Sequence, residues 1–267
     1  MVTLARQGMS ALEDKASTMS GWMQFRLQLS TLPEAFVSLL RTVVVALFVL
    51  TFILQPFFIP SESMEHTLLV GDFLLFNKQV FAPADAVERW LLPYRQVQRG
   101  DIVVFYHTDP PLLVKRVIGL PGDHIRIVNG HVLVNDVALQ EPYVSFEPAP
   151  PNSFRDNFPS RNYTDPDVDP DWWRQMQRLM RNGELVVPRG EYFVLGDNRN
   201  HSMDSRFWGF VPRRAIVAAP VVIYFSLRRP STTDVQRGTD DRLGNDGEFT
   251  ARMAGFARWR RIFRVVH

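Results

Sequence analysis

The most apolar part of the chain lies between residues 32 and 56, where polar side chains are rare. A helix from Leu32 to Gln55 would be about 36 Å long, which is enough to cross the hydrocarbon core of a bilayer. Thr31 and Glu34 form a capping box at its start. Arg41 lies near the same end, where a long side chain can reach the membrane surface. The pattern predicts one transmembrane helix over residues 32–56.

A cleaved signal peptide is the alternative interpretation of this run. About forty residues precede its apolar centre, however, and no Ala-x-Ala-like cleavage site follows it. We therefore interpret residues 1–31 as a tail and the run as an uncleaved anchor. Arg26 and Arg41 precede the apolar centre, and the nearest basic residue after it is Lys78. This bias predicts a cytoplasmic N-terminus and a domain on the outer face of the cell (inner) membrane.

Beyond residue 56 the apolar runs are short and rich in β-branched and aromatic residues, which is typical of strands. They cover residues 70–76, 102–106, 112–120 and 215–227. Asn129-Gly130, between two alternating segments, predicts a β-hairpin over residues 124–134. With 19 prolines as well, the chain is predicted to be mainly β.

Two regions depart from the strand pattern. Residues 147–182 are rich in Pro, Asn and Asp at first and are expected to be an insertion rather than core. They end in a predicted helix with Asp169 as its cap, Pro170 first and Gly183 as its stop. Residues 81–94 suggest another short helical piece. We predict a catalytic domain over residues 57–227 and a tail over residues 228–267, whose basic and aromatic end is either disordered or bound to anionic lipid.

Composition excludes several classes of function. A formal net charge of +2 argues against a nucleic-acid binder. Cysteine is absent and the six histidines are scattered, so neither a thiol nucleophile nor a metal site is expected. No cofactor is predicted.

Candidate chemistry begins at Ser61 and Ser63, which follow Pro60 just outside the predicted membrane segment. Either is a possible nucleophile, although both could simply cap a turn. Lys115 interrupts the apolar strand at residues 112–120. If buried, its pKa would fall from about 10.4 toward neutrality and its free amine could accept a serine proton. The alternative is that Lys115 and Arg116 lie on a solvated edge.

Four segments in this order resemble bacterial type I signal peptidases, membrane-anchored serine proteases that remove signal peptides. The segments are PSESMEHTLLVGDFLL from Pro60, GDIVVF from Gly100, KRVIGLPGD from Lys115 and GDNRNHSMDSRFWGFVP from Gly196. The resemblance extends over residues 37–227. It implies a catalytic core of antiparallel β-sheets with an inserted subdomain.

The same resemblance implies roles for individual residues. Ser63 would be the nucleophile and Lys115 the general base. The Ser61 hydroxyl and the Ser63 backbone N–H would form the oxyanion hole. Ser202 would orient the lysine amine, beside a supporting ion pair between Asp204 and Arg206.

The sequence differs from the family pattern at a few positions near these residues. Glu62 replaces a common Gly, His66 replaces a common Pro, and Asn200-His201 replaces a frequent Asp-Asn pair. A carboxylate beside an oxyanion hole would oppose the developing charge, so we expect Glu62 to point to solvent.

The predicted function is therefore cleavage of signal peptides from exported preproteins after small residues, of the Ala-x-Ala type. The signal peptide would bind as an added strand, in shallow pockets lined by Ile59, Pro60, Met64, Leu68, Leu113 and Val114. Its partners would be signal peptides and membrane lipid, without nucleic acid or metal. Alternatives are a non-catalytic, membrane-anchored β-module that binds peptides, and a Ser-Lys self-cleaving regulator, which would need no anchor.

Overall fold

The computed structural model describes residues 34–49, 53–81, 95–107, 112–163, 165–228 and 256–266. The chain divides into two units, Met1–Thr51 and Phe52–His267. In the first unit, helix α2 (Glu34–Phe48) has no buried residue, and most of its large apolar side chains are exposed. Within the described ranges, no helix has both the length and the apolar character needed to span a bilayer.

The prediction of a helix as far as Gln55 is wrong at its C-terminal end. Residues Leu54–Phe58 form strand β1, which pairs antiparallel with β2 (Asp72–Asn77). Strand β1 lies at the edge of its sheet, where Pro56 is tolerated because one side of the strand needs no N–H donor. The backbone pairing therefore overrides the apolar pattern that predicted a continuous helix, and the predicted boundary at residue 56 falls inside a strand.

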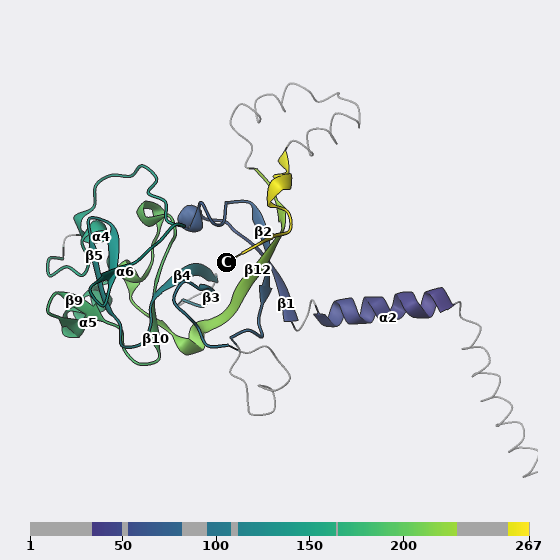
Figure 1. The fold of residues 1–267 in the computed structure, drawn as a ribbon, viewed down its shortest axis with the longest axis horizontal. Coiled ribbons are helices and arrows are strands. Elements are labelled where there is room, and N and C mark those ends of the chain that lie inside the picture. The colour runs from purple at the N-terminus through teal and green to yellow at the C-terminus, as the bar shows by residue number, and fades with distance from the viewer. Residues whose placement is uncertain are drawn as a thin grey trace, which may run out of the picture. The chain divides into compact units, whose positions relative to one another are not determined.

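In the described part of the second unit, the larger sheet has eight strands in the order β1-β2-β12-β3-β4-β10-β11, with β13 paired to β12. The remaining strands of this sheet are β3 (Ile102–Phe105), β4 (Leu113–Gly119), β10 (Glu191–Leu195), β11 (Val211–Pro212), β12 (Ile216–Ser226) and β13 (Arg264–Val265). The long strand β12 pairs with β2 near one end and β3 near the other, with shifts of register between. Such irregularities bend a strand, and Figure 1 shows β12 curving through the middle of a sheet curled like half a barrel.

The smaller sheet has five described strands in the order β7-β6-β5-β9-β8. Their bounds are β5 (His124–Val128), β6 (His131–Val134), β7 (Val137–Ala138), β8 (Met180–Arg181) and β9 (Glu184–Val186). The predicted hairpin is confirmed, since β5 and β6 pair across Asn129-Gly130. Both sides of the predicted insertion thus contribute strands to this sheet (Figure 1).

The predicted insertion, residues 147–182, also contributes to the core. It contains α4 (Ser153–Asp156) and α5 (Pro170–Leu179). Asp169 caps α5 by accepting hydrogen bonds from two backbone N–H groups, as predicted. The helix ends at Leu179, before Gly183, because Met180 and Arg181 pair with β9. Several side chains of the insertion pack with both sheets in one buried cluster; they are Phe154, Phe158, Val168, Trp172 and Met176.

The C-terminal segment, residues 256–266, also differs from the expectation of a disordered or lipid-bound tail. Its strand β13 pairs with β12, so this part of the chain belongs to the larger sheet. The helical piece predicted over residues 81–94 lies almost entirely outside the described residues.

Candidate active site

Ser63 lies on a turn between β1 and β2 that we call the serine turn, residues 59–72. Backbone hydrogen bonds close its base, from Ile59 N to Asp72 O (2.9 Å) and from Gly71 N to Ile59 O (3.1 Å). A short 3₁₀ helix, η2 (Glu62–Met64), places Ser63 on the inner side with 8% of its surface exposed. Ser61 precedes η2 but makes no capping hydrogen bond. Its hydroxyl lies 3.4 Å from the Ser63 hydroxyl instead, so the side chains of both serines lie together.

Lys115 lies in β4, between β3 and β10 near the centre of the larger sheet. Only 4% of its surface is exposed, which contradicts the alternative of a solvated edge. Burial lowers the pKa of its amine, and Arg206 lowers it further, while Asp204 and, less strongly, Asp197 raise it. The net result is a pKa of about 8. An amine with this pKa is largely neutral in mildly alkaline solution, so it can accept a proton.

An apolar cavity of about 170 Å³ joins the serine turn to β4. Ser61, Ser63 and Lys115 all line it. Five of the six predicted substrate-binding residues do so too, namely Ile59, Pro60, Met64, Leu113 and Val114. The sixth, Leu68, does not line this cavity; it is fully buried in the core cluster with Ile59 and Met64. The remaining lining residues are Phe57 and Leu112, whose apolar character alone did not distinguish them from core.

Ser202 lies behind the serine turn, with 4% of its surface exposed. The backbone of Gly196 lies between Ser202 and Ser63, in close contact with both. A Cβ atom added to Gly196 would lie 2.2 Å from Ser202 Oγ and 2.4 Å from the carbonyl oxygen of Ser63. The same carbonyl accepts a hydrogen bond from Asn198 N (3.1 Å). The segment from Gly196 to Ser202 is therefore packed directly against the nucleophile candidate.

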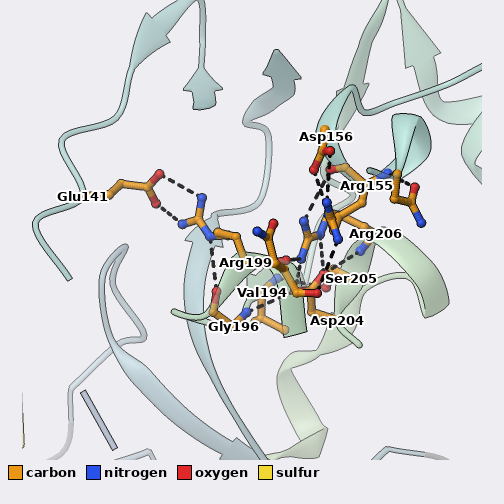
Figure 2. Close-up of polar contacts among 11 residues, drawn as sticks. Glu141, Arg155, Asp156, Val194, Gly196, Arg199, Asp204, Ser205 and Arg206 are labelled. Carbon is orange, nitrogen blue, oxygen red and sulfur yellow. Dashed lines mark hydrogen bonds and ion pairs between the residues drawn. The ribbon is translucent and has the colours of Figure 1, made fainter. Parts of the chain in front are cut away.

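Asp204 and Arg206 form the predicted ion pair (Figure 2). Arg206 Nε donates to one oxygen of the Asp204 carboxylate and Nη2 to the other, both at 2.8 Å. Burial raises the pKa of the Asp204 carboxyl, but the charge and hydrogen bonds of Arg206 and the charge of Lys115 outweigh it and hold the pKa below its ordinary value. The carboxylate therefore stays ionised and favours the charged form of Lys115.

A second buried ion pair was not predicted. Arg116 donates to both carboxylate oxygens of Asp197 at 2.8 Å, and Thr67 of the serine turn donates to the same carboxylate at 2.6 Å. The Arg116 guanidinium also lies 3.9 Å from the centre of the Tyr143 ring. Neighbouring residues of a strand face opposite sides, so the only sequence signal was the Lys115-Arg116 pair in a strand buried on both sides.

The residues that depart from the family pattern do not line the cavity. Glu62 is exposed, as expected. His66 is also exposed and has a φ of 83°, which proline cannot adopt. Asn200 and His201 hydrogen-bond to the carbonyl oxygens of Glu147 and Pro148. They attach the segment before Ser202 to residues 147–148.

A serine and a buried, weakly basic lysine that line one apolar cavity are compatible with a serine hydrolase. Comparisons with known proteins agree with this class. A family model described as signal peptidase, peptidase S26, matches residues 32–225. The chain belongs to this family, as a serine peptidase of the bacterial signal peptidase I type.

Individual relatives support the assignment. A signal peptidase I of Leptolyngbya laminosa is 35% identical over 209 residues, covering 75% of this chain and 83% of the relative. A probable signal peptidase I-2 of Synechocystis is 32% identical over 75% of this chain and 77% of its own length. A signal peptidase I of Aquifex aeolicus is 33% identical over 75% of this chain and 87% of its own length.

Proposed function

We propose that this protein cleaves signal peptides from exported preproteins after small residues, with Ser63 as nucleophile and Lys115 as general base. The observation that carries the proposal is that Lys115, with only 4% of its surface exposed, lines the same apolar cavity as Ser63. A charged ammonium is costly there, and the pKa lowered to about 8 makes the neutral amine available in mildly alkaline solution.

The chemistry follows from these positions. Neutral Lys115 accepts the proton of the Ser63 hydroxyl as the oxygen attacks the scissile carbonyl. The lysine then donates that proton to the leaving amine, and an acyl-enzyme remains. Water, deprotonated by the same lysine, hydrolyses the ester and restores Ser63. The Ser63 N–H and the nearby Ser61 hydroxyl would stabilise the oxyanion in both steps.

Ser202, Asp204 and Arg206 have supporting roles in this proposal. Ser202 would hydrogen-bond to the lysine amine without adding charge. The two members of the ion pair act on the amine in opposite directions, since the Asp204 carboxylate raises the pKa of Lys115 and the Arg206 guanidinium lowers it. Arg206 thereby offsets part of the effect of Asp204 on the pKa of Lys115, and burial remains the largest cause of the lowered value.

Substrate preference follows from the size and lining of the cavity. Its volume is about 170 Å³, and apart from Ser61, Ser63 and Lys115 the residues that line it are apolar. An alanine side chain fits such a space better than a large or charged one. We therefore propose that the residue before the scissile bond is small, as in Ala-x-Ala signals.

A cleavage assay tests this function. Purified protein in detergent should cut a preprotein whose signal peptide ends in Ala-x-Ala, directly after that sequence. It should not cut a matched preprotein with Phe before the scissile bond. Binding of the peptide without cleavage would instead indicate a non-catalytic module.

The pH dependence of the reaction tests the role of Lys115. The base is active only when unprotonated, so kcat/KM should rise as pH increases through an apparent pKa near 8 and level off above it. Ser202→Ala should reduce kcat sharply with little change in KM, because it misplaces the base rather than the peptide. An ascending limb centred near ~10, or wild-type turnover in Ser202→Ala, would contradict the assignment.

We also propose that the protein is a single-pass membrane protein with a cytoplasmic N-terminus. The exposed apolar side chains of α2, such as Leu40, Val44 and Leu47, support an anchor at this part of the chain. Protease added outside spheroplasts should digest the catalytic domain and spare residues 1–31. Digestion of that tail from outside would show that the N-terminus lies on the outer face, opposite to the proposed orientation.

A further inference from the structure

The C-terminal segment, residues 256–266, contacts the serine turn although almost two hundred positions separate them. It is held on β12 by hydrogen bonds from Arg258 N to Ser226 O (2.9 Å) and from Arg228 N to Phe256 O (2.8 Å). Strand β13 continues the pairing, with Val265 opposite Val222. In Figure 1 the segment, in yellow, lies beside β12 and β2.

The contact centres on Asp72, the last residue of the serine turn, whose side chain is fully buried. Arg261 Nη2 donates to one carboxylate oxygen of Asp72 at 2.5 Å, and Nε donates to the other at 3.1 Å. Arg258 lies 3.7 Å from the same carboxylate. Ser226 Oγ and Leu69 N also donate to it, at 2.6 and 2.8 Å. A buried carboxylate needs such partners, and the C-terminal segment supplies the two charged ones.

The same two arginines also bind the backbone of the serine turn. Arg261 Nη2 donates to Thr67 O and Arg258 Nη2 to Val70 O, both at 3.0 Å. At the end of the segment, Val266 packs against the core cluster that contains Met64 and Leu68. The segment therefore holds the half of the turn that follows Ser63 through both polar and apolar contacts.

We propose that the C-terminal segment positions the nucleophile, with Arg258 and Arg261 as positioning residues that act through Asp72 and the turn carbonyls. This inference rests on the proposed function of Ser63. A displacement of about 1 Å in a reacting group can reduce the rate about 10²-fold. The turn connects two strands, and its second half has Asp72 as its buried anchor, so fixing Asp72 limits movement of Ser63. Lys115 lies on a different strand and keeps its surroundings.

The experiment uses the full chain in detergent and a preprotein whose signal peptide ends in Ala-x-Ala. The variants are Arg261→Ala, Arg261→Lys and Asp72→Asn. Arg260→Ala is the matched control, since Arg260 is an exposed neighbour in the same short helix, η5 (Trp259–Arg261). For each variant, kcat, KM, the midpoint of the pH profile and the folded fraction are measured.

Arg261→Ala should lower kcat per folded molecule about tenfold, with KM and the pH midpoint close to wild type. Arg261→Lys should recover part of the loss, because an ammonium can pair with Asp72 but cannot reproduce the fork that also reaches Thr67 O. Asp72→Asn should resemble Arg261→Ala, and Arg260→Ala should match wild type.

Unchanged kcat per folded molecule in Arg261→Ala and Asp72→Asn would overturn the inference. A rise in KM at constant kcat would overturn it too, because the segment would then act on substrate binding. If Arg261→Ala yields no folded protein, Arg261→Lys and Asp72→Asn decide by the same criteria. A wild-type chain that cleaves nothing refutes the proposed function, whereas a wild type that cleaves beside unaffected variants refutes only the positioning role.

Discussion

Ser63→Ala and Lys115→Ala should each reduce kcat/KM at least about 10⁴-fold while leaving the fold intact. Alanine is smaller than either side chain, so neither change causes overlap with the atoms that line the cavity. The two groups act on the same proton, and the effects of such a pair are not additive. The double variant should therefore be no worse than either single one.

Ser61→Ala is the matched control for this experiment. Its hydroxyl lies 3.4 Å from that of Ser63, but it would supply one oxyanion donor rather than the nucleophile. Its loss should cost only about 10²–10³-fold in kcat. Near-normal turnover in Ser63→Ala or Lys115→Ala would end the assignment of the pair, and equal losses in all three variants would point to a general disturbance of the turn.

Gly196→Ala should also reduce kcat severely, by about 10²-fold. Its added Cβ would overlap both Ser202 Oγ and the carbonyl oxygen of Ser63. The backbone carbonyl cannot yield without moving the serine turn, and the hydroxyl cannot yield without leaving its buried position. Because the change separates two groups of the site, kcat should fall more than KM rises.

Gly183→Ala serves as the control for this glycine. It lies in the turn between β8 and β9 with a φ of 84°, and an added Cβ would meet no atom within 4 Å. It should cost about 1 kcal/mol of stability through backbone strain and leave kcat unchanged. Wild-type kcat in Gly196→Ala would show that the contact between the two segments does not position the serine.

Local sequence patterns were sufficient where neighbours along the chain determine the structure. The hairpin at Asn129-Gly130 formed as predicted because its turn geometry depends on those two residues. Asp169 caps α5 because its side chain needs only the next two or three N–H groups. The strand that carries Lys115 was visible as an apolar run for the same reason.

Patterns failed where a distant partner determined the outcome. The apolar run up to residue 56 predicts a helix. From Leu54 onward, however, the backbone is a strand because it pairs with β2. The sequence predicts Leu68 in a substrate pocket, yet its side chain is fully buried in a core cluster. The contacts of the C-terminal segment with Asp72 join residues nearly two hundred positions apart, and no local signal indicates them.

By itself, the sequence determined the mainly β class of the fold, the order of its motifs and the candidacy of Ser63 and Lys115. Only the tertiary structure decided that Lys115 is buried, that it shares a cavity with Ser63 and that its pKa falls to about 8. The physical reason is that desolvation and charge at one amine are sums over atoms from many segments. For Lys115 these include Asp197, Asp204 and Arg206, which the fold alone brings to β4.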